Sequence, residues 1–124
     1  MTFNPVRERG LETFVNPQNV AEMLTDQGTE MSCQYHQVRN GGDIAAIAGM
    51  CKHIFDADDS AQKDGKRVLD VDFIAQHTHG FKEFEQRVRS TGWDDIERES
   101  GLTRQALKEA ADVYTLRGQV FGFS

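Results

Sequence analysis

The residues best suited to chemistry lie in the stretch from Gln34 to Asp43, which reads QYHQVRNGGD. Asn40, Gly41 and Gly42 tolerate positive φ angles and allow close approach of the backbone to a ligand. Asp43 precedes an apolar periodic segment, where its carboxylate could cap a helix. A strand, a glycine turn and a helix start together expose backbone N–H groups and a positive dipole end, which suits part of a nucleotide. An ordinary strand-to-helix connection remains the alternative, because the glycines do not form a GxGxxG motif.

Two other groups of side chains have metal-binding chemistry but not the spacing of a metal site. His77 and His79 are two residues apart, and no CxxC or HExxH motif accompanies them. The acidic run at 56–59 lacks the ligand and glycine spacing of an EF-hand loop. The sequence also has no GxSxG motif, so neither a metal site nor a catalytic residue is predicted. A small metal-binding protein that uses His77 and His79 is kept as a minor alternative.

Composition limits the possible partners. The chain has 124 residues, a size for one domain, and its net charge of -6 argues against a nucleic-acid polymer as partner. A hydrophobic content of 38% and a mean hydropathy of -0.59 are low for an independent core, which favours a marginal fold or a piece of a larger one. No apolar run approaches membrane-spanning length, so the expectation is a cytoplasmic protein that does not enter a membrane. Cys33 and Cys51 are expected to be buried free thiols.

Local patterns predict an α-rich chain with one or two short strands and four or five helices. A strand is expected near Cys33–Val38, and Met1–Pro5 resembles the end of another. Asn16 and Pro17 are typical of the start of a brief helix. A central helix is predicted over 44–55, followed by a surface loop over 56–67. The predicted apolar face of that helix consists of Ile44, Ile47, Ala48, Cys51, Ile54 and Phe55.

Capping signals divide the second half of the chain into further helices. Asp70 or Asp72 can cap a short helix, and Phe81, Phe84 and Val88 mark the next. Thr91 and Asp94 have the spacing of a capping box for a third helix. Gly101 is a natural C-terminal residue for that helix, and Thr103 is an N-cap for the last one.

An ordered series of motifs resembles an internal stretch of the molybdopterin oxidoreductases, in particular the formate dehydrogenase alpha subunit-like (FdhF/YdeP-type) branch. The resemblance covers roughly residues 3–115, and its specificity comes from the order of the motifs rather than from any one of them. The matching segments are 4–14 (NPVRERGLETF), 16–19 (NPQN), 22–25 (EMLT), 38–43 (VRNGGD), 72–74 (DFI), 77–81 (HTHGF) and 96–102 (IERESGL).

The resemblance implies that the chain is part of a site for the guanine dinucleotide end of a molybdenum cofactor. Carried over by position, Asn4, Gly42 and Asp43 are expected near the nucleotide, with Arg39 and Gly41 in support. A carboxylate can accept two hydrogen bonds from a guanine edge, and glycine permits close backbone approach. Two positions depart from the family pattern: Asn4 stands where many relatives have aspartate, and Gly42 replaces the commoner threonine.

These observations predict an α-rich fragment of an α/β family domain. Residues 1–115 would be a partial molybdopterin-oxidoreductase domain, and 116–124 a divergent tail that does not resemble the family's next strand. The chain shows no cysteine cluster for an iron–sulfur centre and no catalytic metal ligand, so it is expected to bind no cofactor and to be inactive alone. Its expected partner is the remainder of the oxidoreductase or a second copy of itself. The alternative is a small helical partner-binding module without catalysis.

Overall fold

The computed structural model describes residues 1–8, 13–14, 29–30 and 34–116. The predicted helix after Asn16, Cys33 and the divergent tail beyond residue 116 lie outside the described residues. Within them the elements are β1 (Thr2–Phe3), β2 (Thr13–Phe14), β3 (Thr29–Glu30), β4 (Tyr35–His36), α3 (Asp43–Gln62), α4 (Val71–His77), α5 (Phe81–Ser90), α6 (Trp93–Ser100) and α7 (Arg104–Leu116).

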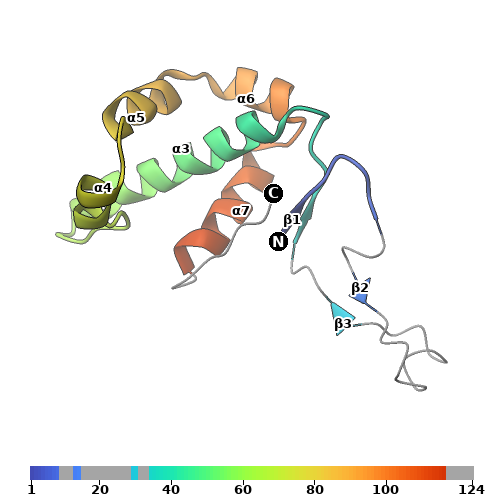
Figure 1. Ribbon diagram of the computed structural model, residues 1–124, viewed down its shortest axis with the longest axis horizontal. Coiled ribbons are helices and arrows are strands. Elements are labelled where there is room, and N and C mark those ends of the chain that lie inside the picture. Colours follow the sequence, from blue (N-terminus) through green and yellow to red (C-terminus); the bar gives the residue numbers. More distant parts are fainter. Residues whose placement is uncertain (9–12, 15–28, 31–33, 117–124) are drawn as a thin grey trace.

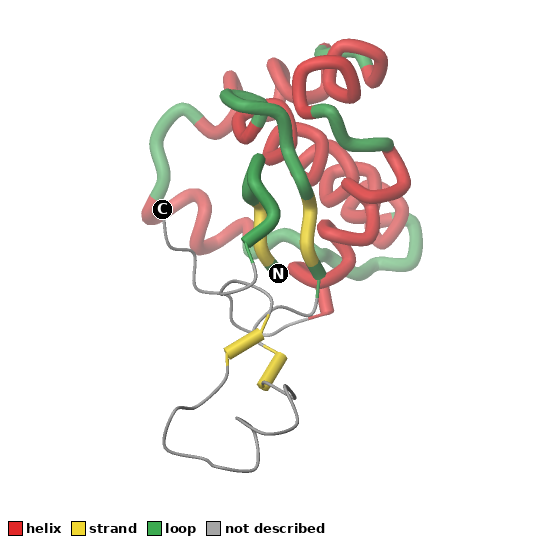
Figure 2. Tube along the Cα trace, turned by 90° about the vertical axis from the view of Figure 1, so that its right-hand side faces the viewer, coloured by secondary structure: helices red, strands yellow, loops and turns green. Residues whose placement is uncertain are grey.

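The predicted α-rich architecture is confirmed. The long helix α3 runs through the middle of the fold, with α5 and α6 along one side and α7 on the other (Figure 1). β1 and β4 form a parallel pair beyond the N-terminal end of α3, and β2 pairs with β3 in antiparallel fashion. Figure 2 shows β1 and β4 side by side next to the helices. No helix in the described parts of the chain is long and apolar enough to cross a membrane.

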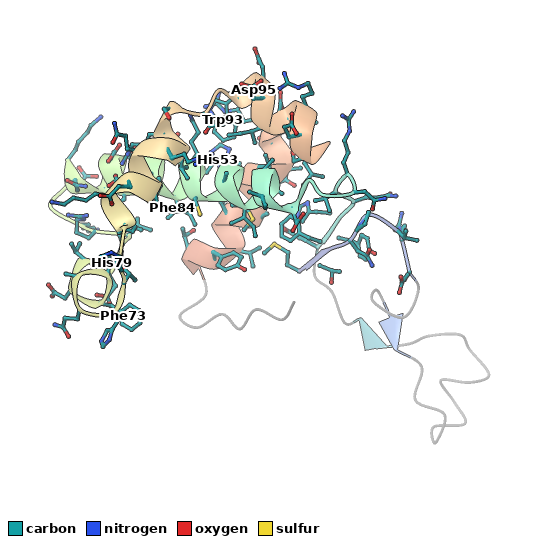
Figure 3. The ribbon with its side chains drawn as sticks, turned by 45° about the horizontal axis from the view of Figure 1, so that its top comes forward. His53, Phe73, His79, Phe84, Trp93 and Asp95 are labelled. Carbon is teal, nitrogen blue, oxygen red and sulfur yellow. The ribbon has the colours of Figure 1, made fainter. Side chains whose placement is uncertain are left out.

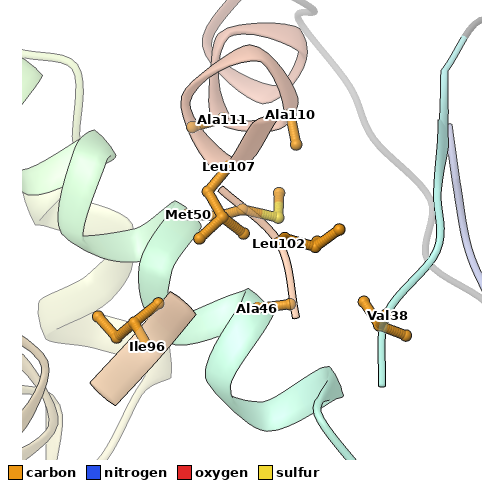
Figure 4. Packing of buried hydrophobic residues seen from close by; sticks show 8 residues of the cluster. All are labelled: Val38, Ala46, Met50, Ile96, Leu102, Leu107, Ala110 and Ala111. Atoms are coloured by element: carbon orange, nitrogen blue, oxygen red, sulfur yellow. The ribbon is translucent and has the colours of Figure 1, made fainter. Parts of the chain in front are cut away.

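The core lies where α6 and α7 meet α3. Gly49 of α3 allows this contact, because a Cβ atom there would lie 2.7 Å from Leu107 Cδ1 and 2.9 Å from Ile96 Cγ2. Leu107 and Ile96 are almost fully buried, at 0% and 1% exposed. The close packing of helices therefore depends on the missing side chain at residue 49. The buried cluster consists of Val38, Ala46, Met50, Ile96, Leu102, Leu107, Ala110 and Ala111 (Figure 4).

The predicted apolar face of the central helix is wrong at its N-terminal end. Ile44 is 78% exposed and Ile47 is 56% exposed, whereas Ala46, Gly49 and Met50 face the core. The small residues face inward because α6 and α7 approach α3 so closely that larger side chains would not fit. The prediction followed the spacing of the large apolar residues, and in the first turns of α3 these lie on the side that faces away from the core.

Several chain-end and helix-end predictions are confirmed. β1 and β4 fall within the two segments expected to be extended. The Asp70 side chain accepts a hydrogen bond from Phe73 N at 2.9 Å and caps α4. Gly101 ends α6 with a φ of 74°, and Thr103 Oγ1 accepts from Ala106 N at 3.2 Å at the start of α7.

The predicted capping box at Thr91 and Asp94 is wrong. Helix α6 begins after Gly92 without a side-chain cap. Thr91 Oγ1 instead donates to the Arg87 carbonyl at 2.8 Å, so Thr91 closes the preceding helix α5. A threonine between two helices can bond to the end of the first or to the start of the second. Thr91 lies four residues after Arg87, a spacing that lets its hydroxyl reach the last turn of α5.

The junction between α5 and α6 is fixed to α3 by Lys52 and Trp93. Lys52 Nζ donates to the carbonyl oxygens of Arg89, at 2.8 Å, and Thr91. It also lies 5.6 Å from the centre of the Trp93 ring, and the Arg104 guanidinium lies 4.6 Å from the same ring. These cation–π contacts join α3, α6 and α7 around one aromatic side chain.

The predicted loop over 56–67 is wrong in its first half, because α3 continues to Gln62. The reason is Asp58, which is only 1% exposed. Its Oδ1 accepts from the backbone amides of Val68 at 2.8 Å and Leu69 at 3.0 Å. Its Oδ2 accepts from Gln62 Nε2 at 2.9 Å and lies 3.0 Å from Arg67 Nη2. One carboxylate thus organises both the last turn of α3 and the returning segment.

The environment of Asp58 also sets its protonation. Burial alone raises the pKa of this carboxyl, but the hydrogen bonds from Leu69, Val68, Arg67 and Gln62 outweigh burial and lower the pKa from 3.8 to about 2. The ionised form of Asp58 is therefore strongly favoured in the folded chain.

We predict that Asp58→Asn lowers the free energy of unfolding at pH 7 by about 2 kcal/mol, the value that corresponds to the pKa shift. Because the folded pKa lies below the ordinary value, this stabilisation is complete above about pH 5 and is lost as the pH falls towards 2. Urea unfolding at pH 7 and at low pH measures the difference. The exposed Asp64, mutated to asparagine, is the matched control and should change stability little. A difference between wild type and Asp58→Asn that does not shrink at low pH would contradict the assignment.

Candidate functional site

The carboxyl ends of the parallel strands β1 and β4 form one edge of the fold. Thr2 pairs with Tyr35 and Phe3 with His36, and Asn4 N donates to the His36 carbonyl at 3.1 Å. Asn4 therefore leaves β1 beside the segment that leads from β4 into α3. Ligands of α/β proteins bind preferentially at this edge, where parallel strands end and the following helix begins.

The chain after Asn4 is held in a turn against β4. Asn4 Oδ1 accepts from Val6 N at 3.2 Å, which closes the turn with the asparagine side chain. The Tyr35 hydroxyl donates to the Val6 carbonyl at 2.7 Å, and Gln37 Nε2 donates to the Pro5 carbonyl at 2.9 Å. The position of Asn4 is thus fixed by strand pairing and by two side chains of the neighbouring segment.

The turn at 39–42 docks onto the C-terminal end of α6. Arg39 N donates to the Ser100 carbonyl and Gly42 N to the Arg39 carbonyl, each at 2.8 Å. A Cβ atom on Gly42 would lie 2.6 Å from the Glu99 carbonyl oxygen. Glycine is therefore required at 42 because two backbone segments of the same chain meet there. This contact explains the glycine without a ligand.

Arg39 has a structural role in the same contact. Its Nη1 donates to the Arg98 carbonyl at 2.7 Å. Its aliphatic part covers Gly101, where a Cβ atom would lie 2.7 Å from Arg39 Cγ. Arg39 thus anchors the turn at 39–42 to the end of α6, and its expected supporting part in cofactor binding stays a prediction.

Gly41 and Asp43 have open surroundings. Gly41 has a φ of 74°, and among the described residues no atom beyond its chain neighbours lies within 4 Å of the position of its missing Cβ. Asp43 is exposed and is the first residue of α3. The prediction that Asp43 caps this helix is wrong, because the N-cap residue is Gly42 and no side chain makes the capping hydrogen bond. The Asp43 carboxylate is therefore not engaged in a cap.

His36 lies beneath the edge as a packed residue. It is 7% exposed, its ring stacks on Phe3 with the ring centres 5.0 Å apart, and its Nε2 lies 3.1 Å from Gln34 Oε1. Burial lowers the pKa of His36. The neutral imidazole is favoured, which suits a side chain that fills space between β1 and β4.

The described residues contain no group of three or more His, Cys, Asp or Glu side chains that could hold a metal ion. His77 packs its ring 4.6 Å from the Phe73 ring on α4. Cys51 is a free thiol that is half-buried, and burial raises its pKa. Within the described residues, neither the paired histidines nor Cys51 has the neighbours that a metal or nucleophilic site would need.

Sequence reasoning missed a second feature, an apolar groove of about 690 Å³ between α3, α5 and α6. Ile44 and Ile47 of α3 line it together with Phe84 and Val88 of α5 and Ile96 of α6. Figure 3 shows Phe84 and Asp95 on the two helices that border this region. The feature of the sequence that could have indicated this groove is the pair of small residues Ala46 and Gly49. They lie on the buried side of α3, and Ile44 and Ile47 therefore lie on its exposed side.

The contact at Gly42 generates a stability prediction. We expect Gly42→Ala to lower the free energy of unfolding by about 1–3 kcal/mol, because the added methyl group meets backbone atoms of Glu99 and Ser100 that cannot rotate away. Gly92→Ala is the matched control: Gly92 is also a helix N-cap, its Cβ would meet only Asp95 Oδ2 at 3.7 Å, and we expect the smaller change of about 0.5–1 kcal/mol that follows from loss of an N-cap glycine. Urea unfolding of both variants is the measurement. Equal stability of the two would show that the turn does not dock on α6 in this way.

Comparison with known proteins supports a relationship to larger proteins. No protein-family model matches the chain. The chain is 44% identical over 115 residues to Protein YdeP of Escherichia coli (strain K12), a match that covers 92% of this chain and 15% of that protein. It is 29% identical over 108 residues to the Uncharacterized oxidoreductase Rv2900c of Mycobacterium tuberculosis, with 87% of this chain and 13% of that protein covered. The chain spans about 15% of the length of these relatives. The resemblance to YdeP-type proteins is thus confirmed, and the chain is similar to a short segment of larger proteins, one of which is named an oxidoreductase.

Proposed function

We propose that the chain is a segment of the cofactor-binding domain of a molybdopterin-guanine-dinucleotide-dependent oxidoreductase of the formate dehydrogenase-like type. The observation that supports this proposal is the pairing of β1 with β4, which sets Asn4 beside His36, from which the chain runs through the turn at 39–42 into Asp43 and α3. Similarity to a protein named as an oxidoreductase supports the reaction class. We place such an enzyme in the cytoplasm.

The residues at this edge fit the guanine end of the cofactor. The Asp43 carboxylate is exposed and can accept hydrogen bonds from the N1–H and the 2-amino group of guanine. The Asn4 side-chain NH₂ group can donate, while its Oδ1 already accepts from Val6 N, and Gly41 leaves open space on the turn that precedes Asp43. The chain's own contribution is to bind and orient the base. A molybdenum centre would supply the two-electron chemistry when the whole cofactor is bound.

We also propose that the chain has no oxidoreductase activity by itself. The relatives are several times longer, so residues for an iron–sulfur centre, for the metal and for a formate-like substrate would lie in the remainder of such a protein. Arg39 is the cation of the turn. Its guanidinium donates to the Arg98 carbonyl and its aliphatic part packs on Gly101, so it does not point into open space. One edge with a carboxylate and an amide can recognise a base but cannot enclose a dinucleotide.

A helical partner-binding module is the second candidate function. The observation that favours it is the apolar groove between α3, α5 and α6, in which Ile44 and Ile47 are exposed. Apolar surfaces of this kind mark sites of association in soluble proteins. The two functions use different faces of the chain and do not exclude one another.

The nucleotide proposal predicts weak, guanine-selective binding by the isolated chain. We expect guanosine diphosphate to shift the amide NMR signals of Asn4 and residues 39–43 with a dissociation constant on the order of 1 mM, because only part of the site is present. Adenosine diphosphate lacks the donor pair that Asp43 accepts from and should cause smaller shifts. Asp43→Asn should abolish the difference between the two nucleotides.

Asp72→Asn is the matched control for that experiment. Asp72 also lies in the first turn of a helix, α4, and is exposed, but it is not at the edge formed by β1 and α3. Its substitution should leave the guanine preference unchanged. Equal shifts with both nucleotides, or a guanine preference that survives Asp43→Asn, would contradict the proposed role of this edge.

The second prediction from the proposed function concerns the metal. The chain purified from cells that make the molybdenum cofactor should contain much less than one molybdenum per chain, because it supplies no metal ligand set among the described residues. Elemental analysis by mass spectrometry measures the ratio. A stoichiometric molybdenum content would show that the isolated chain holds the whole cofactor and would overturn its assignment as a part of the site.

A further inference from the structure

Asn40 and Gly41 form the only Asn-Gly dipeptide in the sequence, and they occupy the middle of a turn. The Gly42 backbone N–H donates to the Arg39 carbonyl at 2.8 Å and closes the turn around them. Gly41 has a φ of 74°, a conformation that a residue without a side chain adopts readily. Both residues are exposed. The Asn40 side chain and the Gly41 amide are therefore adjacent in a segment that solvent reaches.

The backbone amide of Gly41 is not engaged by the fold. Within the described residues its nitrogen makes no hydrogen bond. Among the same residues, no atom beyond its chain neighbours lies within 4 Å of the point where a Cβ would stand. The Asn40 side chain likewise makes no hydrogen bond in the part of the chain that the structure describes. An amide nitrogen that is neither bonded nor shielded can reach the side-chain carbonyl carbon of the preceding residue.

Gly65 offers a comparison within the same chain. It follows the exposed Asp64, it is itself exposed, and its φ of 70° is close to that of Gly41. Among the described residues, the position of its missing Cβ is also open to a distance of 4 Å. Its amide, however, donates to the Gln62 carbonyl at 3.0 Å. The two glycines therefore differ in whether the backbone N–H is held by a hydrogen bond.

We propose that Asn40 is a site of spontaneous deamidation in the folded chain. The Gly41 nitrogen attacks the Asn40 side-chain carbonyl carbon, and the new C–N bond closes a succinimide ring. The amide proton passes through water to the leaving side-chain nitrogen, which departs as ammonia. Water then adds to either carbonyl of the ring and opens it, which gives aspartate or isoaspartate. The reaction consumes water alone, with no oxidant or reductant. The proposal goes beyond the nucleotide function and does not depend on it.

The isoaspartate product conflicts with the docking of the turn on α6. The turn is fixed at both ends, because Arg39 N donates to the Ser100 carbonyl at 2.8 Å and Gly42 lies against the Glu99 carbonyl. In isoaspartate the main chain runs through the former side chain, which lengthens the backbone between these anchors. Aspartate leaves the backbone unchanged and adds a charge to an exposed side chain. Isoaspartate at residue 40 therefore weakens the contact with α6, whereas aspartate leaves it in place.

Peptide mapping by mass spectrometry tests the site after incubation of the folded chain at mildly alkaline pH. Asn40 should be converted to aspartate and isoaspartate. Asn4 and Asn16 should stay intact, because each precedes a proline, which has no N–H to attack with. Asn40→Gln should abolish the isoaspartate signal at this position, since the longer side chain closes a ring far more slowly.

Asp64→Asn is the matched variant, because it places a second asparagine before an exposed glycine of positive φ. In the folded chain this asparagine should deamidate several-fold more slowly than Asn40, since the Gly65 amide is held by Gln62. In concentrated urea the two positions should react at similar rates, because no hydrogen bond then distinguishes the two glycines. The comparison separates the effect of the fold from that of the dipeptide.

Urea unfolding of the aged chain tests the consequence for the turn. The isoaspartate fraction, separated by chromatography, should unfold at a lower urea concentration than the fresh chain, whereas Asn40→Asp should unfold at nearly the same one. Deamidation of Asn40 in urea but not in the folded chain would overturn the proposal, as would equal rates at positions 40 and 64 in the folded Asp64→Asn variant. An isoaspartate fraction as stable as the fresh chain would overturn the predicted loss of docking.

Discussion

The close approach of α6 and α7 to α3 at Gly49 is the contact on which the other features of the fold depend. No side chain fits between the Gly49 backbone and the side chains of Leu107 and Ile96, so α3 has a single orientation that completes the core. That orientation turns Ala46 and Met50 inward. It also forces the isoleucines of the first turns outward. The groove is therefore a consequence of how the core closes.

The same contact positions the edge where β1 and β4 end. Helix α6, once packed on α3, presents the carbonyl oxygens of Arg98 and Ser100 to Arg39, which lies about sixty residues earlier in the chain. Gly42 then fits against Glu99, and the first residue of α3 becomes Asp43. The location of the Asp43 carboxylate is thus decided by residues 98–101. A substitution that disturbs the end of α6 acts on the candidate nucleotide edge without touching it.

The sequence predicted features that depend on a few neighbouring residues and missed those that depend on distant ones. Asp70, Gly101 and Thr103 cap helices as expected, because a cap needs only the adjacent turn. The inward face of α3 was missed because closely packed helices need small residues at their contact. Small residues contribute little to a periodic pattern of hydrophobicity, so the pattern does not reveal that face. The length of α3 was missed because an acidic run reads as a loop unless its partners are known. Asp58 finds those partners in the backbone of Val68 and Leu69, ten and eleven residues away. For the candidate site, the turn at 39–43 was found, but the anchoring of Gly42 and Arg39 by α6 was not readable from local sequence.

Electrostatics limits what the edge at Asn4 and Asp43 can do by itself. The chain carries a net charge of -6, so the approach of a pyrophosphate is opposed at long range, more strongly at low salt. Asp43 adds a negative charge at the N-terminal end of α3, which offsets the attraction that the helix dipole offers to a phosphate. The same carboxylate is well suited to the N–H groups of guanine, which carry no negative charge. Base recognition and phosphate binding therefore make opposite demands on this edge, and the role that we propose for it is base recognition. Arg39, the cation of the turn, donates to the Arg98 carbonyl, so a dinucleotide cofactor would need further cations to neutralise its pyrophosphate.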